Sequence, residues 1–244
     1  PHRGARRLGR GGHRRGATAV DVRAAAVAMT TRRRAACLVG AVAIALGAAA
    51  TATGQYRATI SQLTPAERTA MTPSAWRRGC PVGLDDLRVV RPRYRDFSGR
   101  QRTGYIVVHE DVAPAVARIF RSLYRDKVPI RRMQPIEKYK GSDWRSIEAD
   151  NTSAFNCRKA TGSGRWSNHA YGTAIDINPI ENPWVEPGGV IYHRASKPYI
   201  DRRPRPGMAV EGGALVRAFA REGWKWGGRW KGTKDYQHFS ADGR

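Results

Sequence analysis

Residues 166–178 contain the first pair of side chains whose types could perform chemistry, His169 and Asp176. Gly172 lies between them and is typical of a tight turn. After it, residues 174–178 alternate small or polar with apolar side chains, which is the period of a β-strand. On such a strand Asp176 faces away from the apolar residues beside it, which would face a core. A turn at Gly172 would bring the His169 imidazole back beside the Asp176 carboxylate.

Imidazole and carboxylate groups are ligands of Zn²⁺, and a catalytic zinc site has three protein ligands and one position for water. A candidate third ligand lies in residues 235–239, where His238 follows Asp235 by three positions. We therefore expect His169, Asp176 and His238 to hold a zinc ion. Such an ion lowers the pKa of its water to about 7 and polarises a carbonyl group.

Together the two segments resemble the D-Ala-D-Ala metallocarboxypeptidase family. This family includes vancomycin-resistance dipeptidases and phage L-alanyl-D-glutamate endolysins, and it shares its zinc fold with the hedgehog signalling domain. The resemblance runs from about Cys80 to the C-terminus and rests on two patterns in this order, Ser167-x-His169-x-x-Gly172-x-Ala174-x-Asp176 and Asp235-x-x-His238. It implies a zinc peptidase that hydrolyses amide bonds of peptidoglycan stem peptides. The ligands do not distinguish a carboxypeptidase from an endopeptidase, because relatives of both kinds share them.

The resemblance assigns the role of catalytic base to an acidic residue just before the last ligand, which is Asp235 here. Such a base takes a proton from the attacking water and returns it to the leaving amine. Some relatives have Glu and a Trp before the histidine. The Asp235 and Gln237 of this chain fit the endolysin-like branch better. If Asp235 is only a surface residue, Glu181 and Glu186 are the next candidates.

Three further residues are weaker candidates. Relatives place an arginine upstream of the zinc motif to stabilise the oxyanion, and Arg158 matches by position. In a chain this basic, Arg158 is equally well one arginine among many. Ser167 is expected to donate a hydrogen bond near the substrate or a ligand, although a helix cap or a turn would also explain it. Trp230 could form an exposed wall of the substrate groove, whereas core packing explains most of the nearby aromatic residues.

The composition indicates an anionic partner. The formal net charge is +24 over 244 residues, and residues 1–34 alone hold ten arginines and one aspartate. Such a charge suits nucleic acid, a membrane surface or a cell wall. No nucleic-acid motif is visible, and the basic residues are not interleaved with aromatic ones. We expect anionic cell-wall polymers and peptidoglycan peptides as partners, because the zinc motif also points to the cell wall. We expect no specific nucleic acid as a partner, and a monomer.

The sequence predicts several separate segments before the catalytic domain. Residues 1–28 are expected to be a non-native or disordered basic extension, with translation starting at Met29. Residues 29–52 combine a basic start, an apolar run and small-residue cleavage sites, as a secretory signal peptide does. We expect a secreted or wall-associated protein. An uncleaved membrane anchor is the alternative, although the apolar run of about 16 residues falls short of the roughly 20 that span a bilayer. Residues 53–79 are expected to form a linker or a short helix around Pro65 to Met71, and residues 80–244 the zinc peptidase domain.

Two of the three cysteines are expected to be bonded to each other. Cys37 lies in the apolar run, which leaves Cys80 and Cys157 as a pair. In an exported chain a disulfide is the default for such a pair. Zinc ligation is the alternative, but neither cysteine lies in a C-x-x-C pattern.

The fold class expected is α+β, a small and mainly antiparallel sheet with helices packed on it and the zinc site on the sheet. Strands are predicted at 103–109, 130–136, 174–178, 224–226 and 236–240, and helices at 111–124 and 214–222. Residues 137–166 and 179–210 are expected to be mostly loop. A non-catalytic zinc-containing wall-binding module of the same fold is the alternative function, against which the intact Asp235 argues. A basic wall- or nucleic-acid-binding protein with an incidental site is a further alternative.

Overall fold

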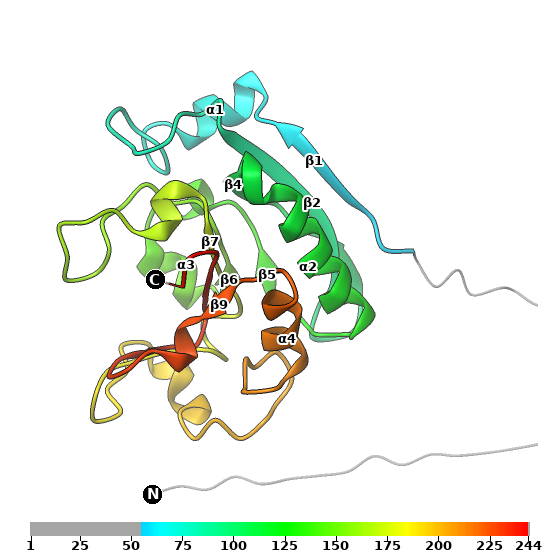
Figure 1. Cartoon of the computed structure of the whole chain (residues 1–244), viewed down its shortest axis with the longest axis vertical. Helices are drawn as coiled ribbons and strands as arrows, with labels where there is room; N and C mark the ends of the chain where they lie inside the picture. The colour runs from blue at the N-terminus through cyan, green and yellow to red at the C-terminus, as the bar shows by residue number, and fades with distance from the viewer. Residues whose placement is uncertain (1–54, 244) are drawn as a thin grey trace, which may run out of the picture. The chain divides into compact units, whose positions relative to one another are not determined.

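The structure, a computed structural model, describes residues 55–243 (Figure 1). The predicted N-terminal extension and signal peptide, residues 1–52, lie outside the described residues. Within residues 55–243, no helix combines the length and apolar character needed to cross a membrane.

The first part of the described chain is a four-stranded antiparallel sheet with one long helix against it (Figure 1). The longest strand, β2 (Leu87–Arg95), pairs with the other three, which are β1 (Ala58–Gln62), β3 (Gln101–Thr103) and β4 (Ile106–His109). The short helix η1 (Glu110–Val112) leads into α2 (Ala113–Arg125). The helix predicted over 111–124 is confirmed, and its apolar stripe is buried in the main core: Val116, Ile119, Phe120 and Leu123.

The short helix expected around Pro65 to Met71 is confirmed as α1 (Pro65–Met71). The rest of the range expected to be a linker also contains a strand, β1. Thr64 begins α1 with a capping box, in which its side chain accepts from the Glu67 backbone and the Glu67 carboxylate accepts from the Thr64 backbone. Met71 is buried in a second core cluster beneath β2. This segment is therefore part of the folded domain.

The middle of the chain holds short elements. Strands β5 (Arg132–Met133) and β6 (Asn151–Thr152) pair in parallel. Between them lie η2 (Ile136–Tyr139) and α3 (Asp143–Glu148), the latter capped by the Ser142 hydroxyl. The strand predicted over 130–136 is thus reduced to two residues, and the region expected to be mostly loop contains a helix.

The last part of the chain forms a three-stranded antiparallel sheet in the order β7 (Ala174–Asp176), β11 (His238–Ser240) and β9 (Lys225–Trp226). Its apolar face packs on α4 (Ala214–Ala220), where the Phe219 and Phe239 rings stack with centroids 4.0 Å apart. The remaining elements are η3 (Asn168–Tyr171), β8 (Trp184–Val185), η4 (Arg194–Tyr199), η5 (Gly227–Arg229) and β10 (Lys234–Asp235). Helices with several small, mainly antiparallel sheets confirm the α+β class.

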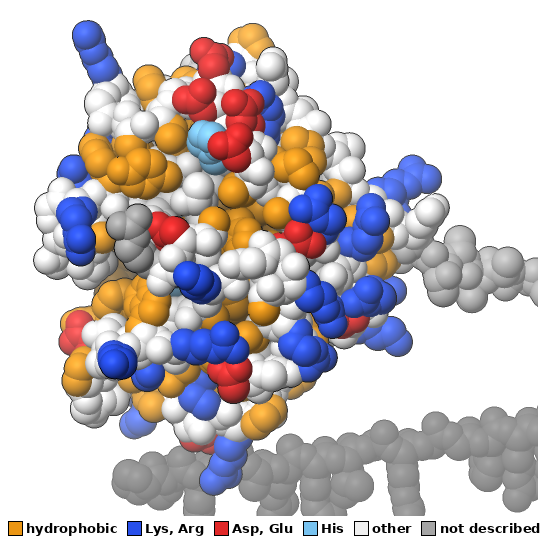
Figure 2. All heavy atoms as spheres, viewed as in Figure 1, with side chains coloured by type: hydrophobic (Ala, Val, Ile, Leu, Met, Phe, Trp, Pro, Cys, Tyr) orange, Lys and Arg blue, Asp and Glu red, His pale blue; other side chains and the backbone are white. Residues whose placement is uncertain are grey.

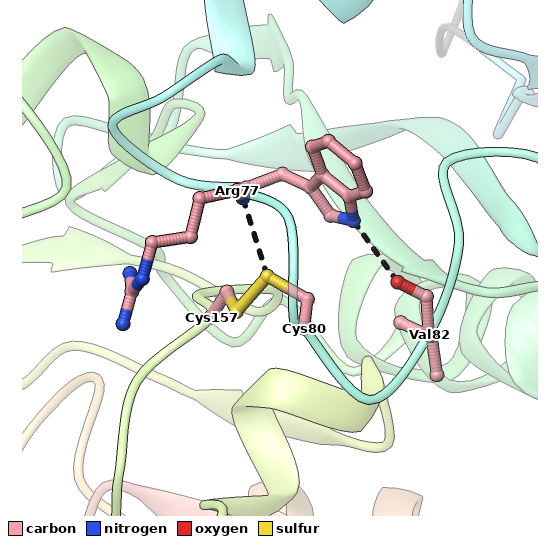
Figure 3. Close-up of a disulfide and its surroundings, with 5 residues drawn as sticks. Arg77, Cys80, Val82 and Cys157 are labelled. Carbon is pink, nitrogen blue, oxygen red and sulfur yellow. Dashed lines mark hydrogen bonds between the residues drawn. A yellow bond between two sulfur atoms is a disulfide. The ribbon is translucent and has the colours of Figure 1, made fainter.

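Cys80 and Cys157 form a disulfide, with their Cα atoms 5.9 Å apart (Figure 3). The Arg77 backbone N–H lies 3.2 Å from the Cys80 sulfur, and the Trp76 indole donates to the Val82 carbonyl at 2.9 Å. The bond ties the loop after α1 to the segment that leads toward the predicted zinc motif. The predicted pairing is confirmed, and neither sulfur is left to hold a metal.

Candidate metal centre

The strand pairing places two of the predicted ligands opposite each other. In the antiparallel register of β7 and β11, His238 is the partner of Asp176. Successive side chains of a strand point to opposite faces, and the neighbours Ile175 and Phe239 are both fully buried in the core. Asp176 and His238 therefore share the other face, where the Nδ1 atom of His238 lies 3.2 Å from the Asp176 carboxylate.

A short helix and a glycine position the third predicted ligand. His169 lies in η3, whose first turn is capped by the Ser167 hydroxyl accepting from the His169 backbone at 3.3 Å. Gly172 ends this helix with a φ of 71°. A Cβ atom at Gly172 would lie 2.6 Å from the backbone nitrogen of His109, so both conformation and space require glycine here. The resulting turn brings His169 back to β7, as the sequence predicts.

Three ligand atoms converge at this point. The Nε2 atom of His169 lies 3.2 Å from Oδ2 of Asp176 and 3.2 Å from Nδ1 of His238, which lies 3.2 Å from the other oxygen, Oδ1, of Asp176. One ligand atom from each residue lies within 4.8 Å of the other two. Ligands about 2.0–2.1 Å from a tetrahedral zinc ion are separated from one another by about 3.3–3.4 Å. The three side chains therefore fit a zinc ion. Burial opposes ionisation of Asp176, but hydrogen bonds and electrostatic interactions with His169 and His238 outweigh it and lower the pKa of the carboxyl.

A hydrogen bond outside the cluster orients His169. Its Nδ1 atom lies 2.6 Å from the carbonyl oxygen of Ala154. Because a carbonyl only accepts, Nδ1 carries the proton, and Nε2 presents a lone pair to the other two ligands. Metal-binding histidines commonly have such a partner, which fixes the tautomer and the ring orientation. The arrangement suits a metal ligand better than an isolated core histidine.

The Asp235 carboxylate lies in the same pocket but outside the ligand cluster. Asp235 is held in β10, opposite Trp184 of β8. It is buried, and its Oδ1 atom has no hydrogen-bond partner within residues 55–243. Burial and the negative charge of Asp176 raise the pKa of the Asp235 carboxyl to about 6. A buried carboxylate beside a metal cluster, with one oxygen that has no hydrogen-bond partner, has the properties of a proton acceptor.

The structure also places the three weaker candidates in this pocket. Arg158 follows the disulfide directly, and its guanidinium forms an ion pair with Asp143. The Ser167 hydroxyl caps η3, which is the structural role expected as the alternative for this residue. Its hydrogen bond to a substrate stays a prediction. The Trp230 indole donates to the Gly243 carbonyl at 3.0 Å, and its ring centroid lies 5.3 Å from that of His238. Trp230 therefore borders the metal cluster.

The two alternative bases do not reach the metal cluster. Glu181 is buried and paired with Arg131 at 3.1 Å. Burial and a hydrogen bond with Asp150 raise the pKa of the Glu181 carboxyl to about 8. The carboxylate of Glu186 accepts from the Tyr192 hydroxyl at 2.7 Å. Neither glutamate is among the described residues that line the pocket, whereas Asp235 is.

A half-buried arginine fixes the chain between Asp235 and the last predicted ligand. Arg202, from the long segment 179–210, lies over the Tyr236 ring with its guanidinium carbon 4.0 Å from the centroid. It also donates to the Asn182 side chain at 3.0 Å and to the Ala209 carbonyl at 2.6 Å. Tyr236 stands next to Asp235, so the long segment supports the geometry of the site. The sequence pattern of residues 179–210 does not predict this contact.

The pocket extends well beyond the metal cluster. Its volume is about 1060 Å³, and its walls include α3, residues 158–168 and residues 191–193. Sequence analysis missed Trp144, His193 and Ser196, which line the part of the pocket formed by α3 and the 191–196 segment. Trp144 lies in a stretch that is expected to be loop. A lone tryptophan in such a polar stretch is the sequence feature that could have indicated a role for Trp144 in the pocket.

Comparison with known proteins supports the same site. The family model described as D-alanyl-D-alanine carboxypeptidase matches residues 161–241. The matched region contains all three predicted ligands and Asp235, whereas Arg158 and the disulfide lie before it. A search of curated proteins and a search of solved structures each gave no match. Over residues 161–241 the chain thus matches the D-alanyl-D-alanine carboxypeptidase family, which confirms the resemblance drawn from its motifs.

Proposed function

We propose that this protein is a secreted zinc metallopeptidase that hydrolyses amide bonds of peptidoglycan stem peptides. One observation carries the proposal. The ligand nitrogens of His169 and His238 lie 3.2 Å apart, each lies 3.2 Å from one oxygen of the Asp176 carboxylate, and they share a pocket with the buried Asp235, whose Oδ1 atom has no partner within residues 55–243. The match to a family of D-alanyl-D-alanine carboxypeptidases supports the peptidase activity and suggests the type of substrate.

The chemistry follows from the residues of the pocket. A zinc ion held by His169, Asp176 and His238 would act as a Lewis acid and make hydroxide available at neutral pH. Asp235 accepts a proton from the attacking water while the oxygen of that water bonds to the scissile carbonyl carbon. Asp235 then gives this proton to the leaving nitrogen as the carbon–nitrogen bond breaks.

Arg158 is the candidate for stabilising the oxygen on which negative charge develops. Its side chain is partly exposed to the pocket, and the ion pair with Asp143 holds its orientation. The disulfide at the preceding residue, Cys157, anchors its backbone. A cation that is already held in place needs little rearrangement when negative charge develops on the nearby oxygen. Stabilising an oxyanion requires this property.

The positive charge along the pocket supports an acidic component of the cell wall as the substrate. Arg158, Lys159 and Arg165 lie along one wall of the pocket and favour ligands that carry carboxylates. Lys and Arg side chains also spread over the face of the molecule drawn in Figure 2. We propose that this basic surface holds the enzyme on anionic wall polymers. Secretion is proposed from the predicted signal peptide, and the disulfide is typical of oxidising compartments.

The test uses the full chain and isolated peptidoglycan. Zinc-loaded protein should release new amino groups from the peptidoglycan, and a chelator should abolish the release. Mass spectrometry of the fragments identifies the bond that is cut and separates a carboxypeptidase from an endopeptidase. A His238→Ala variant should contain less than one zinc per chain by elemental analysis. Stoichiometric zinc in this variant would refute the ligand assignment. Bound zinc without any hydrolysis by the unmodified chain would favour the non-catalytic module instead.

A further inference from the structure

The pocket of the metal centre contains a second group of side chains away from the predicted ligands. We call this group the aromatic shelf; it consists of Trp144, His193 and Ser196. Trp144 lies in α3 and is 49% exposed although it lines the pocket. Its ring packs against the His193 imidazole with centroids 4.1 Å apart and 39° between the planes. An exposed tryptophan inside a pocket indicates a ligand-contacting surface rather than core packing.

Two buried polar atoms of the shelf lack partners. Ser196 is 1% exposed, and neither its hydroxyl oxygen nor the Nδ1 atom of His193 has a hydrogen-bond partner within residues 55–243. Buried polar groups are nearly always paired, so atoms like these point to a group that binds there. Burial also lowers the pKa of His193, which keeps the imidazole neutral at pH 7. The shelf thus offers an aromatic face and two neutral hydrogen-bonding atoms.

The side chains at the shelf are uncharged. Three uncharged residues that neighbour them along the chain also line the pocket: Ile147, Ile191 and Tyr192. The nearest charged pocket residue on the helix, Asp143, is already paired with Arg158. This chemistry does not suit a carboxylate or an ammonium group. It suits a neutral ring that presents C–H bonds on its face and hydroxyl or amide groups at its edge, as a sugar ring does.

Resting on the proposed function, we propose that the aromatic shelf binds an N-acetylated sugar ring of the glycan strand. The preferred substrate is then a stem peptide still attached to its glycan rather than a free peptide. This assigns a specificity role to Trp144, His193 and Ser196, which act on the glycan end of the substrate and not on the scissile bond.

The kinetic test compares two substrates that differ only in the sugar. The kcat/KM of the zinc-loaded chain is measured on a stem peptide with and without its disaccharide. Trp144→Ala should lower the ratio of the two values by about 3- to 10-fold, the usual worth of an aromatic contact. Val190→Ala is the matched control, because Val190 belongs to the same segment and is also 49% exposed but does not line the pocket. Its ratio should equal that of the unmodified chain. An unchanged ratio in Trp144→Ala overturns the proposal.

A binding test keeps the proposal separate from catalysis. A trisaccharide of N-acetylglucosamine should change the tryptophan fluorescence of the unmodified chain, and Trp144→Ala should weaken this binding. Ser196→Ala should weaken it too without lowering the stability to urea, because its hydroxyl has no partner in the protein to lose. Saccharide binding in a chain that hydrolyses no peptide would contradict the proposed function and uphold the shelf. Absence of saccharide binding, or loss of stability in Ser196→Ala, would overturn the shelf whatever the activity.

Discussion

Replacing Gly172 with alanine should disturb the metal centre without touching any predicted ligand. Gly172 has a φ of 71°, a conformation that costs an L-residue about 1–2 kcal/mol. The new Cβ atom would also lie 2.6 Å from the His109 nitrogen and 3.1 Å from the Val108 carbonyl carbon. Both atoms belong to the backbone of β4, which the sheet holds in place. The clash can therefore be relieved only by moving the turn that carries His169.

Gly99 provides the matched control. Its φ is 78°, and a Cβ atom there meets nothing within 4 Å. Gly99→Ala adds the conformational strain but no clash, and alanine recovers about 0.4–1 kcal/mol by restricting the unfolded chain. We expect a net loss of about 1 kcal/mol for Gly99→Ala. For Gly172→Ala we expect a loss of about 3 kcal/mol or more, because forced overpacking adds typically 1–3 kcal/mol.

Urea unfolding of both variants measures these losses, and elemental analysis measures zinc content. Gly172→Ala should also hold less zinc at limiting metal, since His169 is displaced from Asp176 and His238. Gly99→Ala should bind zinc as the unmodified chain does. Equal stability losses in the two variants, or full zinc occupancy in Gly172→Ala at limiting metal, would show that β4 does not constrain the turn.

Three further outcomes are expected. Asp235→Asn should keep its zinc while turnover falls by about 10²–10⁴-fold; loss of zinc would make Asp235 a ligand. A thiol count on denatured, unreduced mature protein should find none at Cys80 and Cys157, and removing their bond should cost about 2–5 kcal/mol of stability; two free thiols would contradict the pairing. The pKa of Glu181 rises from 4.5 to about 8 on folding, so the folded state holds this proton more tightly. The free energy of unfolding should therefore fall between these pH values, and Glu181→Gln should remove that part of the fall; an unaltered slope in urea titrations would refute it.

The metal ligands could be predicted because their positions depend on local rules. A glycine turn followed by alternating residues fixes where His169 and Asp176 point, and the order of the motifs supplies His238. The aromatic shelf could not be predicted, since it requires contact between Trp144 and His193, which lie in separate segments. No local pattern encodes that contact.

Two strands escaped prediction for a different reason. β2 carries several arginines and a proline, which resemble a surface loop. In the structure Arg91, Arg93 and Arg95 are only half-buried, while Tyr94 and the valines of the strand are buried. β1 is mostly exposed and lacks an alternating pattern. It is held by backbone pairing with β2, which side-chain types do not reveal.

The spacing between Asp235 and His238 has a consequence for how this protein can vary. Asp235 is paired with Trp184 of one sheet and His238 with Asp176 of another. Only Tyr236 and Gln237 connect them, and their backbones are bonded to Pro183 and Ile177. One inserted or deleted residue between the two pairings would detach either the base or the ligand. Natural length changes should therefore be absent here and tolerated in exposed turns such as residues 187–190.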